Sequence, residues 1–190
     1  NAEITQTMFD DNIGALDQDE IRRKQRRRLF DSLESIRKEF DLIVIDTPPS
    51  LGYLTISSLI ASDWYVVPVF ASRYDLDGLG KLFNHTQKIV KEYNSDLKLL
   101  GVLQSNFNQR TTTDNQIKDL LRDEFGDSLC RGHISSSVNH RNATLSRQTI
   151  FEYDAKHKAA VQYGELTDEL LGRISEHHGV PYSVKEETSG

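Results

Sequence analysis

The stretch Asp41-Leu-Ile-Val-Ile-Asp46-Thr47-Pro48-Pro49-Ser50-Leu51-Gly52 decides the expected fold class. Residues 42–45 are four consecutive apolar residues, three of them β-branched, which is typical of a strand buried on both faces of a parallel sheet. Such a strand would deliver the carboxylate of Asp46 at its carboxyl end, where ligands bind in open α/β sheets. Two prolines and a glycine follow, so the chain would leave the sheet by a stiff turn.

Asp46 has two interpretations at this stage. Nucleotide hydrolases use an acid in this position to hold a magnesium ion beside the phosphates. An aspartate at a strand end, followed by threonine, also often caps a turn without touching any ligand. The spacing of the residues leaves both interpretations open.

Strands and helices alternate along the rest of the chain. This alternation predicts βαβ units, and therefore an α/β fold with a parallel sheet covered by helices on both faces. The first expected element is a helix that contains Leu29, Leu33, Ile36 and Phe40 and follows a capping signal at Asp17 and Glu20. Four strands are expected, at residues 42–45, 64–70, 97–103 and 130–134. The remaining helices are expected at residues 76–93, at 113–125, where Gly126 ends the helix, and from 155 to about 174.

Composition points to a soluble cytoplasmic protein. The chain has 190 residues, 37% of them hydrophobic, and no apolar run long enough to cross a bilayer. Its first residues lack the features of a signal peptide, and its single cysteine, Cys130, cannot form an internal disulfide. The net charge is -6, but residues 22–28 hold six of the 23 basic residues. This run is either a local nucleic-acid contact or a solvated helix face.

The motif around Asp46 continues into a longer pattern. The sequence resembles the ParA/Soj branch of the deviant-Walker ATPases over about residues 17 to 172, with Asp46 to Gly52 as its Walker B motif. The resemblance implies a P-loop NTPase-like fold. The further matching segments are Leu54-Thr55-Ile56, Ala61-Ser62-Asp63, Val67-Pro68-Val69, Tyr74 to Leu79, Gly101-Val102-Leu103, Asn108 to Thr111, Phe125-Gly126-Asp127, Tyr153-Asp154, Ala159-Ala160 and Tyr163.

The resemblance implies roles for individual residues. Asp46 would hold Mg²⁺ through its water shell, and Thr47 to Gly52, including Pro48 and Pro49, would form the loop that senses the γ-phosphate of ATP. Arg110 matches an arginine that the family uses to hold DNA phosphate; otherwise it is a surface arginine that pairs with a neighbour such as Asp114. The residues expected to border the adenine are Ser105, Asn106 and Phe107.

The resemblance also implies partners. We expect a homodimer that is bridged by ATP and binds DNA non-specifically, and a centromere-binding ParB-like protein that stimulates hydrolysis to ADP and releases the dimer. A nucleoid-associated location in the cytoplasm follows. A membrane-cycling ATPase of the MinD type would need a basic amphipathic helix near the carboxyl end, which residues 173–181 do not provide.

Two departures from the family pattern stand out. Residues 134–139 read Ile-Ser-Ser-Ser-Val-Asn where the family usually has Ile-Pro-Arg-Asn-Val-Arg, so the proline and both arginines are missing, and a second DNA-binding arginine is not where the motif would put it. His140 and Arg141 lie next to this segment and are candidates to substitute. We hypothesise that Arg110, Arg141 and part of the run at residues 22–28 form the DNA patch, because phosphate contacts need only positive charge and reach.

The second departure is the phosphate-binding loop. No Gly-x-x-x-x-Gly-Lys-Ser/Thr occurs in the sequence, so the chain by itself is not expected to hydrolyse ATP. We expect residues 1–178 to form one partial α/β domain that needs an amino-terminal P-loop portion, and residues 179–190 to form a flexible tail. The alternative is a shortened relative that binds DNA or a protein partner without hydrolysing nucleotide.

Overall fold

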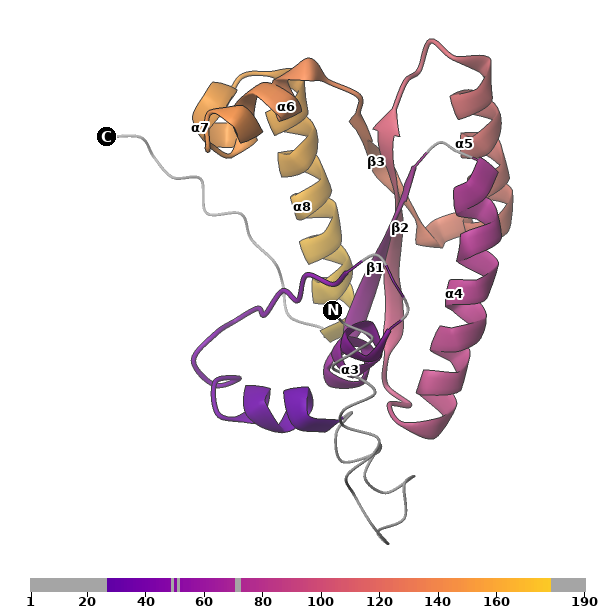
Figure 1. Cartoon of the computed structure of the whole chain (residues 1–190), viewed down its shortest axis with the longest axis vertical. Coiled ribbons are helices and arrows are strands. Elements are labelled where there is room, and N and C mark those ends of the chain that lie inside the picture. The colour runs from indigo at the N-terminus through magenta and orange to yellow at the C-terminus, as the bar shows by residue number, and fades with distance from the viewer. Residues whose placement is uncertain (1–26, 49, 51, 71–72, 179–190) are drawn as a thin grey trace, which may run out of the picture. The chain divides into compact units, whose positions relative to one another are not determined.

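The structure is a computed structural model that describes residues 27–48, 50, 52–70 and 73–178 (Figure 1). The chain divides into two compact units. The first contains residues 1–63 and 86–96, and the second contains residues 64–85 and 97–190. Each unit is described by itself below.

The second unit is built on a parallel three-stranded sheet. Its strands are β1 (Trp64–Phe70), β2 (Lys98–Phe107) and β3 (Leu129–Ser135), and they lie side by side in chain order (Figure 1). The bounds of β1 are those expected from the sequence, and β2 is longer than expected by four residues at its carboxyl end. The predicted α/β class with a parallel sheet is therefore confirmed.

Helices cover both faces of this sheet. Helix α5 (Thr112–Phe125) lies on one face and α8 (Lys158–His178) on the other (Figure 1). Neighbouring strand residues point to opposite faces, and the two cores show it: Val102 packs with Ile117 and Leu121 of α5, whereas Leu103 packs with Leu166 of α8. The second unit also contains the first part of α4 (Arg73–Glu92), the 3-10 turn η1 (Gly126–Ser128), α6 (Val138–Leu145) and α7 (Ile150–Asp154).

Local capping explains where several helices begin and end. The hydroxyl of Thr111 accepts a hydrogen bond from the backbone N–H of Asp114 at the start of α5. Thr149 and Glu152 form a reciprocal capping box at the start of α7. Helix α5 ends at Gly126, whose φ of 48° lies in the left-handed region that favours glycine. The sequence prediction of a stop at this glycine is confirmed.

Replacement of Gly126 by alanine is expected to lower the free energy of unfolding by about 1 kcal/mol, because a Cβ disfavours the left-handed conformation. A Cβ at this position would meet no atom within 4 Å, so the effect is purely conformational. Gly164 lies inside α8 and a Cβ there is equally unhindered. Gly164→Ala should therefore stabilise by about 0.5–1 kcal/mol. Urea unfolding followed by the fluorescence of Trp64 measures the free energy of unfolding of each variant. A change of the same sign in both variants would contradict this explanation.

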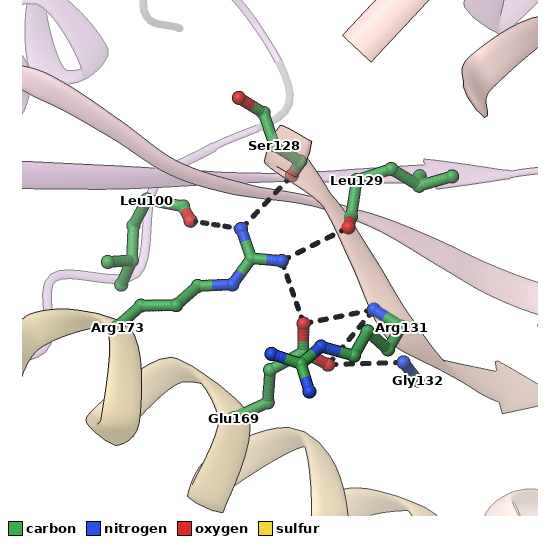
Figure 2. A network of polar contacts seen from close by, with 7 residues as sticks. All are labelled: Leu100, Ser128, Leu129, Arg131, Gly132, Glu169 and Arg173. Carbon is green, nitrogen blue, oxygen red and sulfur yellow. Dashed lines mark hydrogen bonds and ion pairs between the residues drawn. The ribbon is translucent and has the colours of Figure 1, made fainter. Parts of the chain in front are cut away.

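An ion pair joins α8 to the ends of two strands (Figure 2). Arg173 Nη2 lies 2.7 Å from Glu169 Oε1, and both side chains are largely buried. The guanidinium donates to the carbonyl oxygens of Leu100 at 3.0 Å, Leu129 at 3.1 Å and Ser128 at 3.4 Å. The Glu169 carboxylate accepts the backbone N–H groups of two edge-strand residues, Arg131 at 2.9 Å and Gly132 at 3.1 Å.

The surroundings of this pair shift two pKa values. Burial raises the pKa of Glu169, but the hydrogen bonds from the Arg131 and Gly132 backbone and the contact with Arg173 outweigh burial, so its pKa lies below the usual value. Burial, reinforced by Glu169 and opposed by Arg173, raises the pKa of the Cys130 thiol to about 11. Cys130 is buried and reduced, which makes it a structural thiol.

The first unit holds α3 (Tyr53–Ala61) and a helical segment at residues 27–34. The expected capping signal at Asp17 and Glu20 lies outside the described residues. Phe40, predicted to lie on the apolar face of this helix, follows it instead and is 58% exposed.

The predicted strand at residues 42–45 is wrong for this structure. No strand is assigned there, and Leu42 and Val44 are 53% and 82% exposed. A strand exists only where a neighbour accepts its backbone hydrogen bonds, and the described strands pair only with one another. The apolar sequence of a buried strand is thus present without a hydrogen-bonding partner in the described part of the chain.

Candidate functional site

Asp46 and Thr47 lie in an irregular, exposed segment of the first unit. Pro48 is also exposed, whereas Pro49 lies outside the described residues. Among the described residues, the carboxylate of Asp46 has no hydrogen-bond or ion-pair partner. Asp46 is exposed, and because Pro49 and Leu51 lie outside the described residues, both interpretations of this aspartate stay open.

A single exposed carboxylate fits the way Mg²⁺ is held in nucleotide sites. Such sites use one or two protein carboxylates and leave the other positions of the ion to water and phosphate oxygens. The described residues contain no group of three or more His, Cys, Asp or Glu side chains that could hold a metal ion by themselves. Asp46 can accordingly serve a magnesium ion that arrives with a phosphate ligand.

The three residues expected near a nucleobase lie at the carboxyl end of β2. Asn106 is exposed and has a φ of 54°, a left-handed conformation that asparagine tolerates better than most residues. Ser105 is half-buried. Phe107 is only 2% exposed, and its ring packs against His133 with 4.7 Å between the ring centroids. The side chains available to a ligand here are therefore those of Ser105 and Asn106.

Gln162 of α8 is a residue that the sequence analysis did not single out. Its Oε1 accepts the backbone N–H of Ser135 at 3.0 Å, and its Nε2 donates to the hydroxyl of Ser135 at 2.9 Å. The backbone N–H of Ser136 in turn donates to the carbonyl oxygen of Phe107 at 3.0 Å. Gln162 thus ties the end of β3 to α8, and the Ser136 bond ties it to the end of β2. A glutamine on the apolar face of a helix gives no sequence signal for this role.

His133 lies beside this group of contacts. Burial lowers its pKa, and the nearby charges of Lys118 and Lys158 lower it further, against a smaller opposite effect of Glu165. The lowered pKa favours the neutral form of the imidazole.

Arg110 lies in the turn between β2 and α5 and is exposed. Asp114, the neighbour considered as its partner, instead accepts the backbone N–H of Asn108 at 2.6 Å. The side chain of Asn108 accepts the backbone N–H of Arg110 at 3.1 Å, so the turn is held by its own side chains. The guanidinium of Arg110 remains available to solvent.

Arg141 is exposed on α6, which follows β3. Since β2 and β3 are parallel neighbours, Arg110 and Arg141 follow the same edge of the sheet. His140 differs from its neighbour: its ring packs edge-on against Tyr163, 5.8 Å between centroids, and its Nε2 is buried. Of the two candidates to replace the missing arginines, Arg141 is exposed, whereas His140 is half-buried with its Nε2 atom covered. Of the basic run at residues 22–28, Arg27 and Arg28 are described, and both are exposed.

Comparisons with known proteins show which proteins this chain is similar to. The profile of a family described as an AAA domain matches residues 11–99. The sporulation initiation inhibitor protein Soj of Bacillus subtilis is 36% identical over 143 residues, which are 75% of this chain and 56% of that protein. The chromosome partitioning protein ParA of Myxococcus xanthus is 35% identical over 147 residues, 77% of this chain and 52% of that protein. The chain therefore spans little more than half the length of these relatives.

The fold also matches a solved nucleotide complex. Cobyrinic acid a,c-diamide synthase from Mycobacterium smegmatis, with bound ADP and magnesium, is similar with a TM-score of 0.66 and 26% identity, covering 83% of this chain and 57% of that chain. The predicted P-loop NTPase-like fold is confirmed. Among the described helices, none is both long and apolar enough to cross a membrane.

Proposed function

Because the chain belongs to the ParA/Soj family of partition ATPases, we propose that it acts in the segregation of a plasmid or chromosome as an ATP-dependent dimer that binds DNA non-specifically. The observation that carries this proposal is the exposure of Arg110 and Arg141 after adjacent parallel strands, on the edge of the sheet where α/β nucleotide proteins bind their ligands. ATP and Mg²⁺ are the ligands that the Asp46 motif fits best.

Asp46 would hold Mg²⁺ through water, and Thr47 would contact the metal-bound phosphates. Magnesium supplies electrostatic stabilisation of the charge that develops on the transferred phosphoryl group. The residues of this chain contribute by placing one carboxylate beside the metal and by bordering the nucleotide. Pro48 and Pro49 would stiffen the loop after Asp46, while Ser105 and Asn106 would border the base beside the packed ring of Phe107.

We further propose that the strand sequence at residues 42–45 pairs with a strand that carries the phosphate-binding loop. The reason is physical: Leu42 and Val44 are too apolar to be favoured in water, yet both are largely exposed here. Residues 1–178 would then act as the carboxy-terminal part of a larger ATPase domain, followed by a tail at residues 179–190. Mass measurement of the intact protein shows directly whether that part exists.

Arg110 and Arg141 would contact DNA phosphates together with basic residues of the run at 22–28. The double variant Arg110→Ala, Arg141→Ala is expected to bind random-sequence duplex more weakly and to reduce the slope of log affinity against log salt by about 2, since each lost phosphate contact removes about 0.9 from the slope. Filter retention across a salt series measures both quantities.

Arg122 provides the matched control, since it is exposed on the outer part of α5 and lies near Asp119 rather than at the same edge of the sheet. Arg122→Ala should leave the slope unchanged. An unchanged slope in the double variant would contradict the proposed patch. Equal retention of DNA with and without ATP would contradict the ATP-dependent dimer.

A centromere-binding ParB-like protein would stimulate hydrolysis, and the nucleoid would be the site of action in the cytoplasm.

The second candidate function is a non-hydrolysing module of the same fold that binds DNA or a protein. A nucleotide-binding measurement separates the two, because the ATPase would bind ATP, whereas a module that has lost the phosphate-binding loop would not.

A further inference from the structure

The hydroxyl of Thr55 makes a contact that is unusual for a helix residue. Thr55 lies in the first turn of α3 and is 8% exposed, and its Oγ1 lies 2.6 Å from the carbonyl oxygen of Ser50 and 3.4 Å from that of Pro48. A hydroxyl has one proton to donate, so the shorter contact with Ser50 is the main hydrogen bond. The side chain therefore reaches back out of its own helix into the segment that follows Asp46.

Other hydroxyls of the helix behave differently. Ser58 donates to the carbonyl oxygen of Leu54, and the C-cap residue Ser62 donates to that of Ser58, which is the ordinary bond to the residue four positions earlier. The N-cap residue, Gly52, has no side chain with which to cap the helix. Thr55 thus fastens the preceding segment to helix α3 through its side chain.

The far end of α3 is held in place by Asn94. The Nδ2 group of this residue lies 2.8 Å from the carbonyl oxygen of Ser62, 3.1 Å from that of Leu59 and 3.2 Å from that of Ile60. These are the carbonyl groups that the end of a helix leaves without partners inside the helix. Helix α3 is consequently fixed at its carboxyl end, and Thr55 joins the segment after Asp46 to a fixed element.

We propose that Thr55 is a positioning residue for the Asp46 segment (residues 46–48 and 50). By holding the Ser50 carbonyl, its hydroxyl fixes where the chain turns after Asp46 and Thr47, and so limits the positions that the Asp46 carboxylate can occupy. The consequence for hydrolysis rests on the proposed ATPase function. The restraint on the segment itself does not, and it can be measured without nucleotide.

The test compares Thr55→Val, which keeps the size but removes the donor, with Thr55→Ser, which keeps the donor. Each is combined with Ser50→Cys carrying a nitroxide; Ser50 is exposed, and its backbone carbonyl is retained. Cys130 should not react at pH 7, because its pKa is about 11 and it is buried. We expect the central line of the nitroxide spectrum to narrow in Thr55→Val and to match the parent in Thr55→Ser. Equal line widths in all three proteins would overturn the proposal.

Steady-state ATP hydrolysis supplies a second readout in the complete protein. Thr55→Val should lower kcat more than it changes KM, and Thr55→Ser should recover kcat; a fall in stability alone would leave kcat per folded molecule unchanged. Circular dichroism at 222 nm confirms that each variant is folded. If the parent does not hydrolyse ATP, the proposed function fails, while the nitroxide spectra still decide whether Thr55 restrains the segment.

Discussion

Glu169→Ala is expected to lower the free energy of unfolding of the second unit by about 3 kcal/mol. The change removes the partner of a buried arginine and leaves the backbone N–H groups of Arg131 and Gly132 without their acceptor (Figure 2). Trp64, the single tryptophan, lies in this unit, so its fluorescence during urea denaturation measures the effect.

Asp168→Ala is the matched control, since Asp168 is the exposed neighbour on the same helix. It should change the free energy of unfolding by less than about 0.5 kcal/mol. A double variant, Glu169→Ala with Arg173→Met, should lose less than the sum of the single losses because no unpaired charge remains. Strict additivity, or an effect of Glu169→Ala no larger than that of the control, would contradict the assigned role.

The same pair predicts a pH dependence. The pKa of Glu169 is lower in the folded protein than in the unfolded chain, so the unfolded chain takes up a proton first as pH falls. Its contribution to stability is therefore fully present above the unfolded pKa of about 4.3 and is lost as pH drops through the folded value. The stability difference between the parent and Glu169→Gln should shrink below about pH 4.3 and be constant above it.

Asp46→Asn is expected to lower kcat for ATP hydrolysis by roughly 100-fold or more in the complete protein. A bound magnesium ion contributes several kcal/mol of charge stabilisation, and each 1.4 kcal/mol corresponds to about a factor of ten. The substitution keeps the size of the side chain and removes the charge that would hold the ion's water shell. Release of phosphate under saturating ATP, with Mg²⁺ present, measures kcat.

Asp41→Asn provides the comparison. Asp41 is also exposed and precedes the same apolar segment, but it lies at the opposite end from the proposed metal position. It should leave kcat within about twofold, an effect below 0.5 kcal/mol. A similar loss in both variants would show that general negative charge, rather than the carboxylate of Asp46, matters for hydrolysis.

The second unit could be predicted well because its signals are local. The β-branched run of β1 and the Gly126 stop after α5 each fix an element through nearby residues. Helices α6 and α7 were not predicted, because they are short and show no clear apolar periodicity; α6 starts at the single polar cap Ser137 and α7 at the capping box of Thr149 and Glu152. Their positions follow from packing against α8 rather than from periodicity.

The candidate site could be predicted only in part. The sequence identified Asp46, Arg110 and Arg141 by residue type, and the structure shows all three exposed. The sequence could not reveal that the ring of Phe107 is buried, or that the side chains of Thr55 and Gln162 form hydrogen bonds with backbone groups of other segments. Such contacts join residues whose pairing leaves no pattern in the sequence.

The prediction of a strand at residues 42–45 failed for a different reason. Local sequence determines that this segment can form a buried strand, but a strand also needs a neighbour. Propensity is local, whereas hydrogen-bond pairing in a sheet is not. The exposure of Leu42 and Val44 is the visible result.

The central claim is that Asp46 serves the magnesium ion of a bound nucleotide. The most direct test is the affinity of the complete protein for ATP, measured by calorimetry with Mg²⁺ and again with EDTA, for the parent and for Asp46→Asn. We expect Mg²⁺ to tighten ATP binding to the parent and this gain to disappear in Asp46→Asn, while the affinity in EDTA stays the same. An equal gain from Mg²⁺ in both proteins would contradict it.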